Sequence, residues 1–514
     1  MRTKLLFLFF FLFHVFVLSA QKKKLVDTTA TKLPKLTLLN HQRIMGELLG
    51  EPKIDIKEIG IFVAEGFNTL EALGAMSVFS EMMNVKIQYI APKAGWIRSE
   101  IGLEILVEKS VEEITTLDLL IVPGGNNLYL EQQLANDPVL AWLKSIDQGS
   151  KLTLSSGTGT LLLGNTGVLK DKQVTLDWYE AEHNSRVFGG KWIDKRYTND
   201  GKYWSSVGQS GIIDASLALL YAITSKNHVQ GAMLDLEYDP QPPLNGGTQP
   251  LTPEHVLKSF QAISIKNSDY RVLSSNTTSL PNSSTKPVKT IGILVYDQFF
   301  TLDAIGPLVA LSQTPGVSIQ LIGKEKGKLK SGRTILQVPN SLQEVNQLDV
   351  LVVPGGAVST FNATQDTTLI NWIRKIDRQS LYTTSVCTGS WILGKAGLLK
   401  GKKATSHWYR AQERLEYYGA NYQKARYISD GKYWTSAGVS AGIDFSFALM
   451  KELYGTDLVY AAMLNLHYHP EPIVLGGTPE KSNPLVTDMM MQMYDYGMLP
   501  LFDKEKKLEK RKNK

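Results

Sequence analysis

The sequence has 514 residues, of which 43% are hydrophobic and 20% are charged, a composition typical of a soluble globular protein with more than one domain. The formal charge of +6 lies at the ends, because the first 24 residues contribute +5 and residues 503–514 contribute +4, which leaves −3 for the remainder. We therefore exclude nucleic acid as the main partner. We expect the basic tail at 504–514 to be a solvated, frayed end, with contact to an anionic surface as the alternative.

Residues 1–20 have the pattern of a secretory signal peptide. Two basic residues precede an apolar run at 5–18, and small Ser19 and Ala20 come before a lysine-rich stretch. The run is shorter than a typical membrane-spanning helix, so an uncleaved N-terminal anchor is the less favoured alternative. We expect the rest of the chain to be exported to a periplasmic or extracellular space, with no stable membrane insertion after cleavage.

If the chain is exported, its single cysteine and three of its asparagines lie in an environment where disulfides can form and glycosylation can occur. Because Cys387 is the sole cysteine, no internal disulfide can form, and stability must come from core burial. A free thiol in that setting suggests a chemical role, and a small buried hydrophobic side chain is the alternative. Asn276, Asn282 and Asn362 are formal glycosylation acceptors, which matters only in a pathway that glycosylates.

The chain contains an internal repeat at an offset of 230 to 232 residues. The stretch LIVPGG at 120–125 matches LVVPGG at 351–356, and DGKYW at 200–204 recurs unchanged at 430–434. Such a match indicates a gene duplication. We predict a polar N-terminal segment at 21–56, a first copy at 57–250, a helix and polar linker at 251–289, a second copy at 290–480 and a C-terminal segment with the basic tail at 481–514.

Within each copy, short apolar runs alternate with amphipathic stretches, as at 291–295, 303–312 and 348–353. Apolar runs without polar alternation suit parallel strands that are covered on both faces. Helices that connect such strands make right-handed crossovers. We therefore predict an α/β fold of two tandem three-layer sandwiches, each a mostly parallel sheet with helices on both faces and a site at the carboxyl ends of its strands.

The second copy places Cys387 between a β-type run at 381–386 and a helical stretch that begins at Thr388. A sharp strand-to-helix turn presents the side chain at the top of the sheet, and Gly389 permits the tight turn. The free amides and the positive dipole end of the helix favour thiolate over thiol. We therefore expect Cys387 to be a nucleophile.

Two further loops should converge on Cys387 because they also follow strands. The loop at Gly355 and Gly356 can direct a backbone amide at a developing negative charge, with the amide of Thr388 as a second donor. Asp303 would bring a carboxyl group to the thiol, and it could act as acid and base in turn if the neighbouring thiolate keeps it protonated. The alternative for Asp303 is an N-cap of the first helix of the copy.

Four spaced motifs carry these residues: FTLDAIGP at 300–307, PGG at 354–356, CTGS at 387–390 and ATSHW at 404–408. Together they resemble the ThiJ/PfpI superfamily, in its isonitrile hydratase-like branch. The resemblance covers nearly all of both copies and implies a flavodoxin-like fold related to class I glutamine amidotransferases. It also implies working roles for Cys387, Thr388 and Asp303.

Members of this branch hydrate an isonitrile to an N-substituted formamide without a metal or organic cofactor. The resemblance therefore implies a small-molecule substrate, attack by the Cys387 thiolate, proton transfer by Asp303 and orientation by Thr388. Peptidase-like and glyoxalase-like members often carry histidine where this chain has Thr388, which argues against proteolysis and leaves deglycase or glyoxalase activity as a weaker alternative. The branch also supplies sensor halves of transcription regulators, but no helix-turn-helix pattern follows residue 480.

The first copy lacks the chemistry of the second. Its packing and turn positions are kept, so we predict a pseudo-enzyme domain. Loss of the histidine together with the cysteine suggests that His407 belongs to the same site, as a substrate-binding residue; the alternative is a strand-end histidine bonded to backbone. The correspondences are Cys387 with Gly157, His407 with Asp177, Asp303 with Glu71 and Thr388 with Thr158.

Three expectations concern the rest of the chain. His467 and His469 could bind a metal on one strand face, but two ligands fall short of a typical site, so we expect no metal. The methionines at 489–491 and 493 are expected to form a packing surface. Superfamily relatives commonly pair, and a tether raises the local concentration of one copy around the other to roughly millimolar. We therefore predict that the copies pair within one chain.

A cysteine-dependent hydratase or hydrolase is our leading hypothesis for the function of the chain, and a non-catalytic ligand-binding or sensor protein is its rival.

Overall fold

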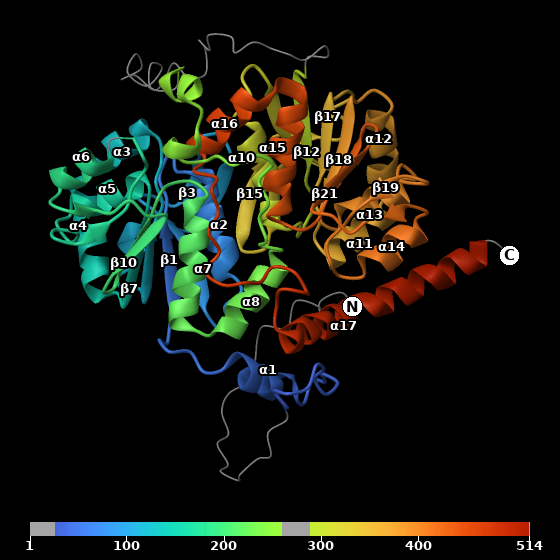
Figure 1. Ribbon diagram of the computed structural model, residues 1–514, viewed down its shortest axis with the longest axis horizontal. Helices are drawn as coiled ribbons and strands as arrows, with labels where there is room; N and C mark the ends of the chain where they lie inside the picture. The colour runs from blue at the N-terminus through green and yellow to red at the C-terminus, as the bar shows by residue number, and fades with distance from the viewer. Residues whose placement is uncertain (1–25, 180, 260–287, 513–514) are drawn as a thin grey trace.

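The computed structural model describes residues 26–179, 181–259 and 288–512. The predicted signal peptide, Asn276, Asn282 and most of the predicted linker lie outside these residues. The two repeat copies lie side by side, and each is built around one seven-stranded sheet with helices on both faces (Figure 1). The predicted α/β architecture of two tandem units is confirmed.

In both sheets the neighbouring strands are parallel except for one antiparallel hairpin at an edge. Three central strands, β6 (Leu119–Val122), β7 (Leu152–Ser156) and β17 (Val350–Val353), are buried at every position, as expected for apolar runs that are covered on both faces. In spatial order, the first sheet contains β10 (Tyr197–Asp200), β11 (Tyr203–Ser206), β7 (Leu152–Ser156), β6 (Leu119–Val122), β1 (Glu58–Phe62), β2 (Lys86–Ala91) and β5 (Lys109–Ser110). The second sheet repeats this order with β21 (Tyr427–Asp430), β22 (Tyr433–Ser436), β18 (Tyr382–Val386), β17 (Val350–Val353), β12 (Thr290–Leu294), β13 (Ser318–Gly323) and β16 (Asn340–Ser341).

The inner helices lie between the two sheets and the outer helices lie at the far ends of the molecule (Figure 1). The inner helices are α2 (Thr69–Phe79), α7 (Gly211–Ile223), α10 (Thr301–Leu311) and α15 (Ala441–Tyr454). The outer helices are α3 (Asn127–Leu134), α4 (Asp137–Gly149), α5 (Thr158–Gly164) and α6 (Ala181–Val187) in the first copy, and α11 (Val358–Gln365), α12 (Thr367–Asp377), α13 (Gly389–Lys395) and α14 (Ala411–Tyr417) in the second. Each copy ends on one more helix, α8 (Lys226–Asp235) or α16 (Thr456–Asn465).

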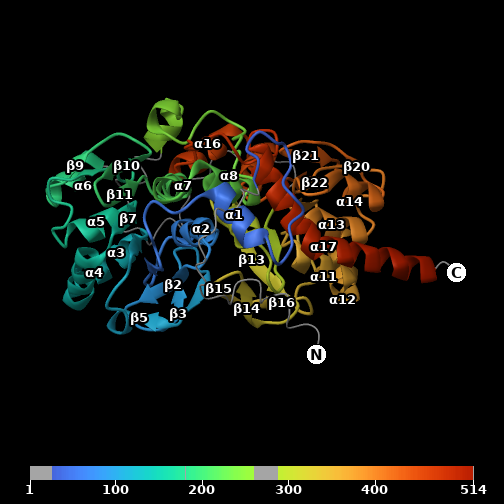
Figure 2. The ribbon, with the colours of Figure 1, turned by 90° about the horizontal axis from the view of Figure 1, so that it is seen from below.

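The copies contact each other through equivalent elements. Helices α2 and α10 pack together, and strand β4 (Glu104–Val107) pairs with β15 (Thr334–Val338). The hairpin of β3 (Gly95–Arg98) and β4 and that of β14 (Gly327–Ser331) and β15 thereby form one four-stranded sheet (Figure 2). The turns after α8 and α16 also cross over: the Gln241 N–H donates to Asp444 at 2.8 Å, and the Glu471 N–H donates to Asp214 at 3.1 Å. These reciprocal contacts give the two copies an approximate twofold relation.

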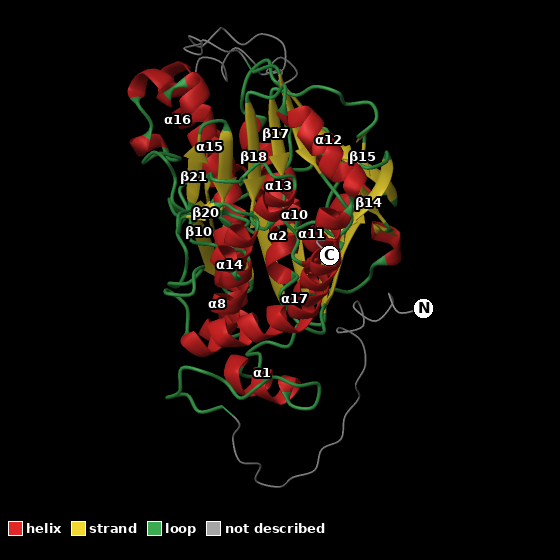
Figure 3. Cartoon of the chain, turned by 90° about the vertical axis from the view of Figure 1, so that its right-hand side faces the viewer, coloured by secondary structure: helices red, strands yellow, loops and turns green. Residues whose placement is uncertain are grey.

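The C-terminal segment forms one long helix, α17 (Pro484–Lys512), that starts beside the first copy and runs along the second (Figures 1 and 2), and Figure 3 looks nearly along its axis. Its beginning packs on α8 and on α1 (His41–Leu49) of the N-terminal segment. Met489 and Met490 are buried in this contact, which confirms the predicted packing role for these two, whereas Met493 is 45% exposed. Among the described residues, none of the helices combines the length and the apolar character needed to cross a membrane.

The expectation of a frayed basic tail is wrong for its first turn. Phe502 is buried against Trp391, with ring centroids 5.8 Å apart, and Glu505 forms a buried ion pair with Arg414 at 2.8 Å. Helical spacing places Met498, Phe502 and Glu505 on one face of α17, and that face docks on the second copy. The net charge of the segment could not predict this docking, because it does not show which residues lie on the face of the helix that packs on the second copy.

Candidate active site of the second copy

Cys387 lies at the sharp turn between β18 and α13, where the sequence predicts it. Its φ of +59° is a left-handed conformation that residues other than glycine rarely adopt. Its amide donates to the carbonyls of Ser436 at 3.1 Å and Ala437 at 2.8 Å, and a side chain at Gly389 would come within 2.1 Å of the Val353 carbonyl oxygen. Hydrogen bonds and close packing therefore hold the cysteine in a strained turn at the carboxyl edge of the sheet.

Asp303 lies in the first turn of α10, and its carboxyl group and the thiol of Cys387 are close enough for each to shift the pKa of the other. Its Oδ2 accepts the Gly355 N–H at 2.9 Å, and its buried Oδ1 has no hydrogen-bond partner among the described residues. Burial raises the pKa of Asp303 to about 7, so this group can exchange a proton near neutral pH. The N-cap alternative is wrong, because Phe300 holds that position and the Asp303 side chain bonds across the site.

The thiol is held in its protonated form. Cys387 is completely buried, and burial followed by the charges of Asp303 and Glu237 raises its pKa well above the ordinary value. The backbone N–H of Thr388 acts in the opposite direction. The expected preference for thiolate is therefore wrong for this state, because lost hydration and two nearby acids outweigh one helix N-terminus. A proton must leave the sulfur before it can attack.

Thr388 anchors a set of buried hydrogen bonds beside the thiol. Its Oγ1 accepts the Gly356 N–H at 3.1 Å and lies 2.9 Å from the Oγ1 of Thr360. Since the Gly355 N–H donates to Asp303, both amides of the predicted oxyanion loop already have partners. An oxyanion role for this loop stays a prediction, and it requires these bonds to be exchanged during the reaction.

His407 is buried in the loop after β19 (Lys403–Ala404). Its Nδ1 accepts the Tyr409 N–H at 3.3 Å, which assigns the hydrogen to Nε2. Burial lowers the pKa of His407 to about 3, so the ring is neutral. The backbone hydrogen bond that the alternative predicted is present. The backbone of Asp235 also lies near enough to the ring to raise its pKa against the effect of burial, but the buried Nε2 makes no hydrogen bond of acceptable geometry to the described residues. One donor is therefore available for a bound group.

Two residues that the sequence did not identify reach this site from distant segments. Glu237, in the turn after α8 of the first copy, accepts the N–H of Trp408 at 2.9 Å and the N–H of Gly438. Tyr494 of α17 packs its ring on His407 and Trp408, with centroids 5.7 and 5.8 Å apart. Neither residue belongs to a local motif, because each enters from another part of the chain.

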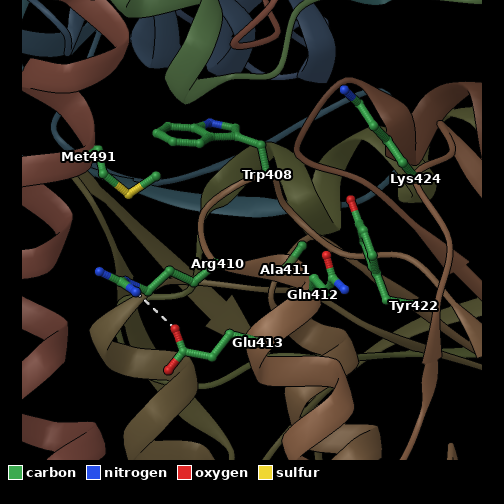
Figure 4. A pocket seen from close by; sticks show the side chains of 8 residues that line it. All are labelled: Trp408, Arg410, Ala411, Gln412, Glu413, Tyr422, Lys424 and Met491. Atoms are coloured by element: carbon green, nitrogen blue, oxygen red, sulfur yellow. Dashed lines mark hydrogen bonds and ion pairs between the residues drawn. The ribbon is translucent and has the colours of Figure 1, made fainter. Parts of the chain in front are cut away.

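A surface cleft of about 530 Å³ adjoins the buried centre (Figure 4). Trp408 lines the cleft and contacts His407, with ring centroids 5.4 Å apart, so it is shared by the cleft and the buried site. Arg410, also in the wall, is held by Glu413 and by Asp495 of α17, both at 2.8 Å.

The equivalent site of the first copy is filled. Gly157 keeps the left-handed turn with a φ of +51°. Glu71, one methylene longer than the aspartate of the second copy, accepts the N–H of Gly124 and the N–H of Gln209, both at 2.7 Å. Asp177 faces the second copy. The architecture of the turn is retained, and a carboxyl group occupies the space that a nucleophile and its acid share in the second copy.

His467 and His469 do not lie on a strand, so the expected strand-face pair is wrong. Both follow α16, where His467 has a φ of +48° that ends the helix. His467 Nε2 lies 3.3 Å from Asp177 of the first copy, and His469 Nδ1 lies 3.1 Å from the carbonyl oxygen of Gly246. The described residues contain no group of three or more histidine, cysteine or acidic side chains placed to hold a metal ion.

The family model of the DJ-1/PfpI family matches residues 57–222 and 289–452. The chain belongs to the DJ-1/PfpI family. The two matches coincide with the two repeat copies, and they confirm the superfamily that the motifs predicted. Isonitrile hydratase from Pseudomonas putida is 38% identical over 199 residues, which cover 38% of this chain and 86% of that protein.

The chain is also similar to proteins with other names. The HTH-type transcriptional regulator CdhR from Pseudomonas aeruginosa is 36% identical over 91 residues, or 18% of this chain and 27% of that protein. Protein DJ-1 homolog B from Arabidopsis thaliana is 21% identical over 415 residues, or 78% of this chain and 86% of that protein. A crystal structure of a ThiJ/PfpI family protein from Pseudomonas syringae is 29% identical with a TM-score of 0.41, and the match covers 44% of this chain and 96% of that chain.

Proposed function

We propose that the second copy is a cysteine-dependent hydratase that converts small isonitriles to N-substituted formamides. The observation that supports this most directly is the burial of the Cys387 thiol beside the buried Asp303 carboxyl group, whose Oδ1 has no hydrogen-bond partner among the described residues. The terminal carbon of an isonitrile must receive both a nucleophile and a proton, and a thiol next to a carboxyl group that exchanges protons near neutral pH can deliver both. The similarity to isonitrile hydratase supports this substrate class.

The proposed reaction has two steps. First, Asp303 takes the thiol proton and passes it to the terminal carbon while the sulfur forms a C–S bond there, which gives a thioimidate. Second, Asp303 accepts a proton from water as the water oxygen adds to the same carbon, and it passes this proton to the substrate nitrogen. The C–S bond then breaks as the new hydroxyl group becomes the formamide carbonyl, Asp303 transfers the hydroxyl proton to the departing sulfur, and the formamide leaves. The net reaction adds one water molecule to the isonitrile.

His407 and Thr388 have supporting roles in this scheme. The unpartnered Nε2–H of His407 is a buried, neutral donor for the oxygen that adds to the carbon. The Thr388 N–H lowers the pKa of Cys387 and so favours the negative charge that develops when the thiol proton leaves. Both donors are preorganised in a site that is closed to bulk water, where such contacts are most effective.

Turnover of a simple alkyl isonitrile by the purified full-length protein tests this function. We expect stoichiometric formamide, measured by NMR, and we expect Cys387→Ala to abolish it without loss of the fold. Glu71→Gln changes the equivalent carboxyl group of the first copy and should leave the rate unchanged. Equal rates for the parent and Cys387→Ala would refute a role for the thiol.

A non-catalytic ligand-binding or sensor role is the second candidate. It is favoured by the complete burial of a protonated Cys387 and by the similarity to a transcriptional regulator. This role predicts that a small molecule raises the melting temperature without conversion to product. Melting curves and product analysis on the same small-electrophile panel separate the two functions.

We further propose that the mature protein is exported after removal of residues 1–20, on the basis of the signal-peptide pattern. Mass spectrometry of the protein secreted by its host should find an N-terminus close to Gln21. An intact N-terminus on a membrane-bound protein would favour the anchor instead.

A further inference from the structure

Two equivalent turns, one from each copy, enter the site of the other copy. Glu237 lies at the tip of the first and His467 at the tip of the second, with φ values of +39° and +48°. The carbonyl oxygen of Glu237 accepts from Arg426 at 2.8 Å and from Ser440 at 2.7 Å, and that of His467 accepts from Arg196 at 2.6 Å and from Ser210 at 2.8 Å. The backbones of the two turns are docked in the same way. The difference between the two turns therefore lies in the side chains at their tips.

The two tip side chains make different contacts. The Glu237 carboxylate accepts two backbone N–H groups of the second copy, one from Trp408 and one from Gly438. His467 instead faces the Asp177 carboxylate of the first copy at 3.3 Å. Each site thus contains one acid and one histidine at these two positions, but the copy that supplies each residue is exchanged, and only His467 and Asp177 contact each other directly. In the second copy the histidine is its own, and the acid is supplied by the first copy.

One peptide group links Glu237 to the nucleophile turn. The peptide between Ala437 and Gly438 donates its N–H to Glu237 and accepts the N–H of Cys387 at 2.8 Å on its carbonyl oxygen. Hydrogen bonds in such a chain polarise one another. The other amide that Glu237 binds follows His407 directly, so one carboxylate restrains both the cysteine turn and the histidine loop.

We propose that Glu237 of the first copy is a positioning residue of the second copy's active site. It holds the strained Cys387 turn and the His407 loop in register, and the second copy is incomplete without it. This need explains why the first copy keeps its fold after the loss of its own cysteine. Only the turnover measurement below rests on the proposed hydratase function.

Burial raises the pKa of Glu237 to about 8, so Glu237 is charged at the alkaline pH at which the thiol titrates, and this charge provides a direct signal of its role. Glu237 and Asp303 both raise the pKa of Cys387, so removal of the Glu237 charge should lower it. The other titratable groups around the Cys387 and Asp303 pair come from several elements and are Asp235 at the end of α8, His407 after β19, Tyr296 after β12 and Tyr494 on α17. None of them is altered in the test below.

The test compares Glu237→Gln with His467→Gln in the full-length protein. Glutamine keeps the size of glutamate, but its amide nitrogen cannot accept the second backbone N–H. His467→Gln disturbs the equivalent tip of the same interface without a contact to the thiol. Because Cys387 is the only cysteine, the ultraviolet absorbance of its thiolate against pH, corrected with Cys387→Ala counterparts, reports its titration alone.

We expect Glu237→Gln to lower the thiol midpoint by roughly one pH unit and to lower kcat for an isonitrile by about tenfold or more, with little change in KM. His467→Gln should match the parent in both measurements. A parent-like titration for Glu237→Gln, or the same shift in His467→Gln, would overturn the proposal. If the parent shows no isonitrile turnover, the hydratase function fails while the thiol titration still decides the role of Glu237.

Glu237→Asp protects the test against misfolding of the glutamine variant. Aspartate keeps the charge but is one methylene too short to hold both amides at their present positions. We expect it to keep the thiol midpoint close to that of the parent and to lower kcat. A kcat for Glu237→Asp equal to that of the parent would contradict a positioning role.

Discussion

Replacement of Asp303 by asparagine should stabilise the fold above neutral pH while it abolishes turnover. Asp303 is completely buried, and its pKa rises from the ordinary 3.8 to about 7. Between these values the folded chain holds a proton that the unfolded chain releases, so the stabilising contribution of this group is present at low pH and is lost as the pH rises toward 7. A shift of this size corresponds to about 4 kcal/mol. Asparagine carries no such cost, and its Oδ1 can still accept the Gly355 N–H.

Urea unfolding of the parent and Asp303→Asn measures this effect. The difference in unfolding free energy should grow from near zero at about pH 4 to as much as about 4 kcal/mol at about pH 8 in favour of the variant. Asp297→Asn, at an exposed position in the same loop, controls for the loss of one negative charge. A difference between the parent and Asp303→Asn that stays constant over this range would refute the reasoning. Parent kcat/KM should rise through a midpoint of about pH 7 as Asp303 ionises.

Other predictions test the long helix, a second buried acid and the pairing of the copies. Glu505→Gln should lower the free energy of unfolding in urea by about 3 kcal/mol, because it leaves the buried Arg414 without its counter-charge. Lys395→Met removes a more exposed partner of the same carboxylate and should lower it by less than about 1 kcal/mol. Equal losses for the two variants would contradict this reasoning. Partial burial and the charge of nearby Asp235 raise the pKa of Glu81 well above its ordinary value, so Glu81→Gln should stabilise the protein at neutral pH, and a gain that does not fade toward about pH 4 would count against the assignment. Residues 286–514 expressed alone should aggregate or self-associate, because α10 loses its packing on α2 and β15 loses its pairing with β4. A stable, active monomer in light scattering would show that the second copy does not need to pair with the first.

The protonation state of the thiol shows where sequence reasoning failed. A cysteine at the start of a helix carries a local signal for a thiolate, because the helix dipole depends only on neighbouring residues. The pKa of Cys387 depends in addition on complete burial and on the Asp303 and Glu237 carboxylates. Burial is produced by the whole fold, and Glu237 enters from the other copy. The larger effects were therefore the non-local ones.

The sequence by itself determined the duplication, the α/β layers, and the strand-to-helix turn with Cys387, Thr388 and Asp303 beside it. These follow from periodicity and from the rule that parallel strands bring their carboxyl ends to one edge. Only the tertiary structure decided which distant residues complete the site. Glu237 and Tyr494 enter it from the first copy and from α17, and their contacts depend on how whole elements dock. Docking depends on the shape of surfaces that are assembled from many segments, so these contacts cannot be predicted from any short stretch of the sequence.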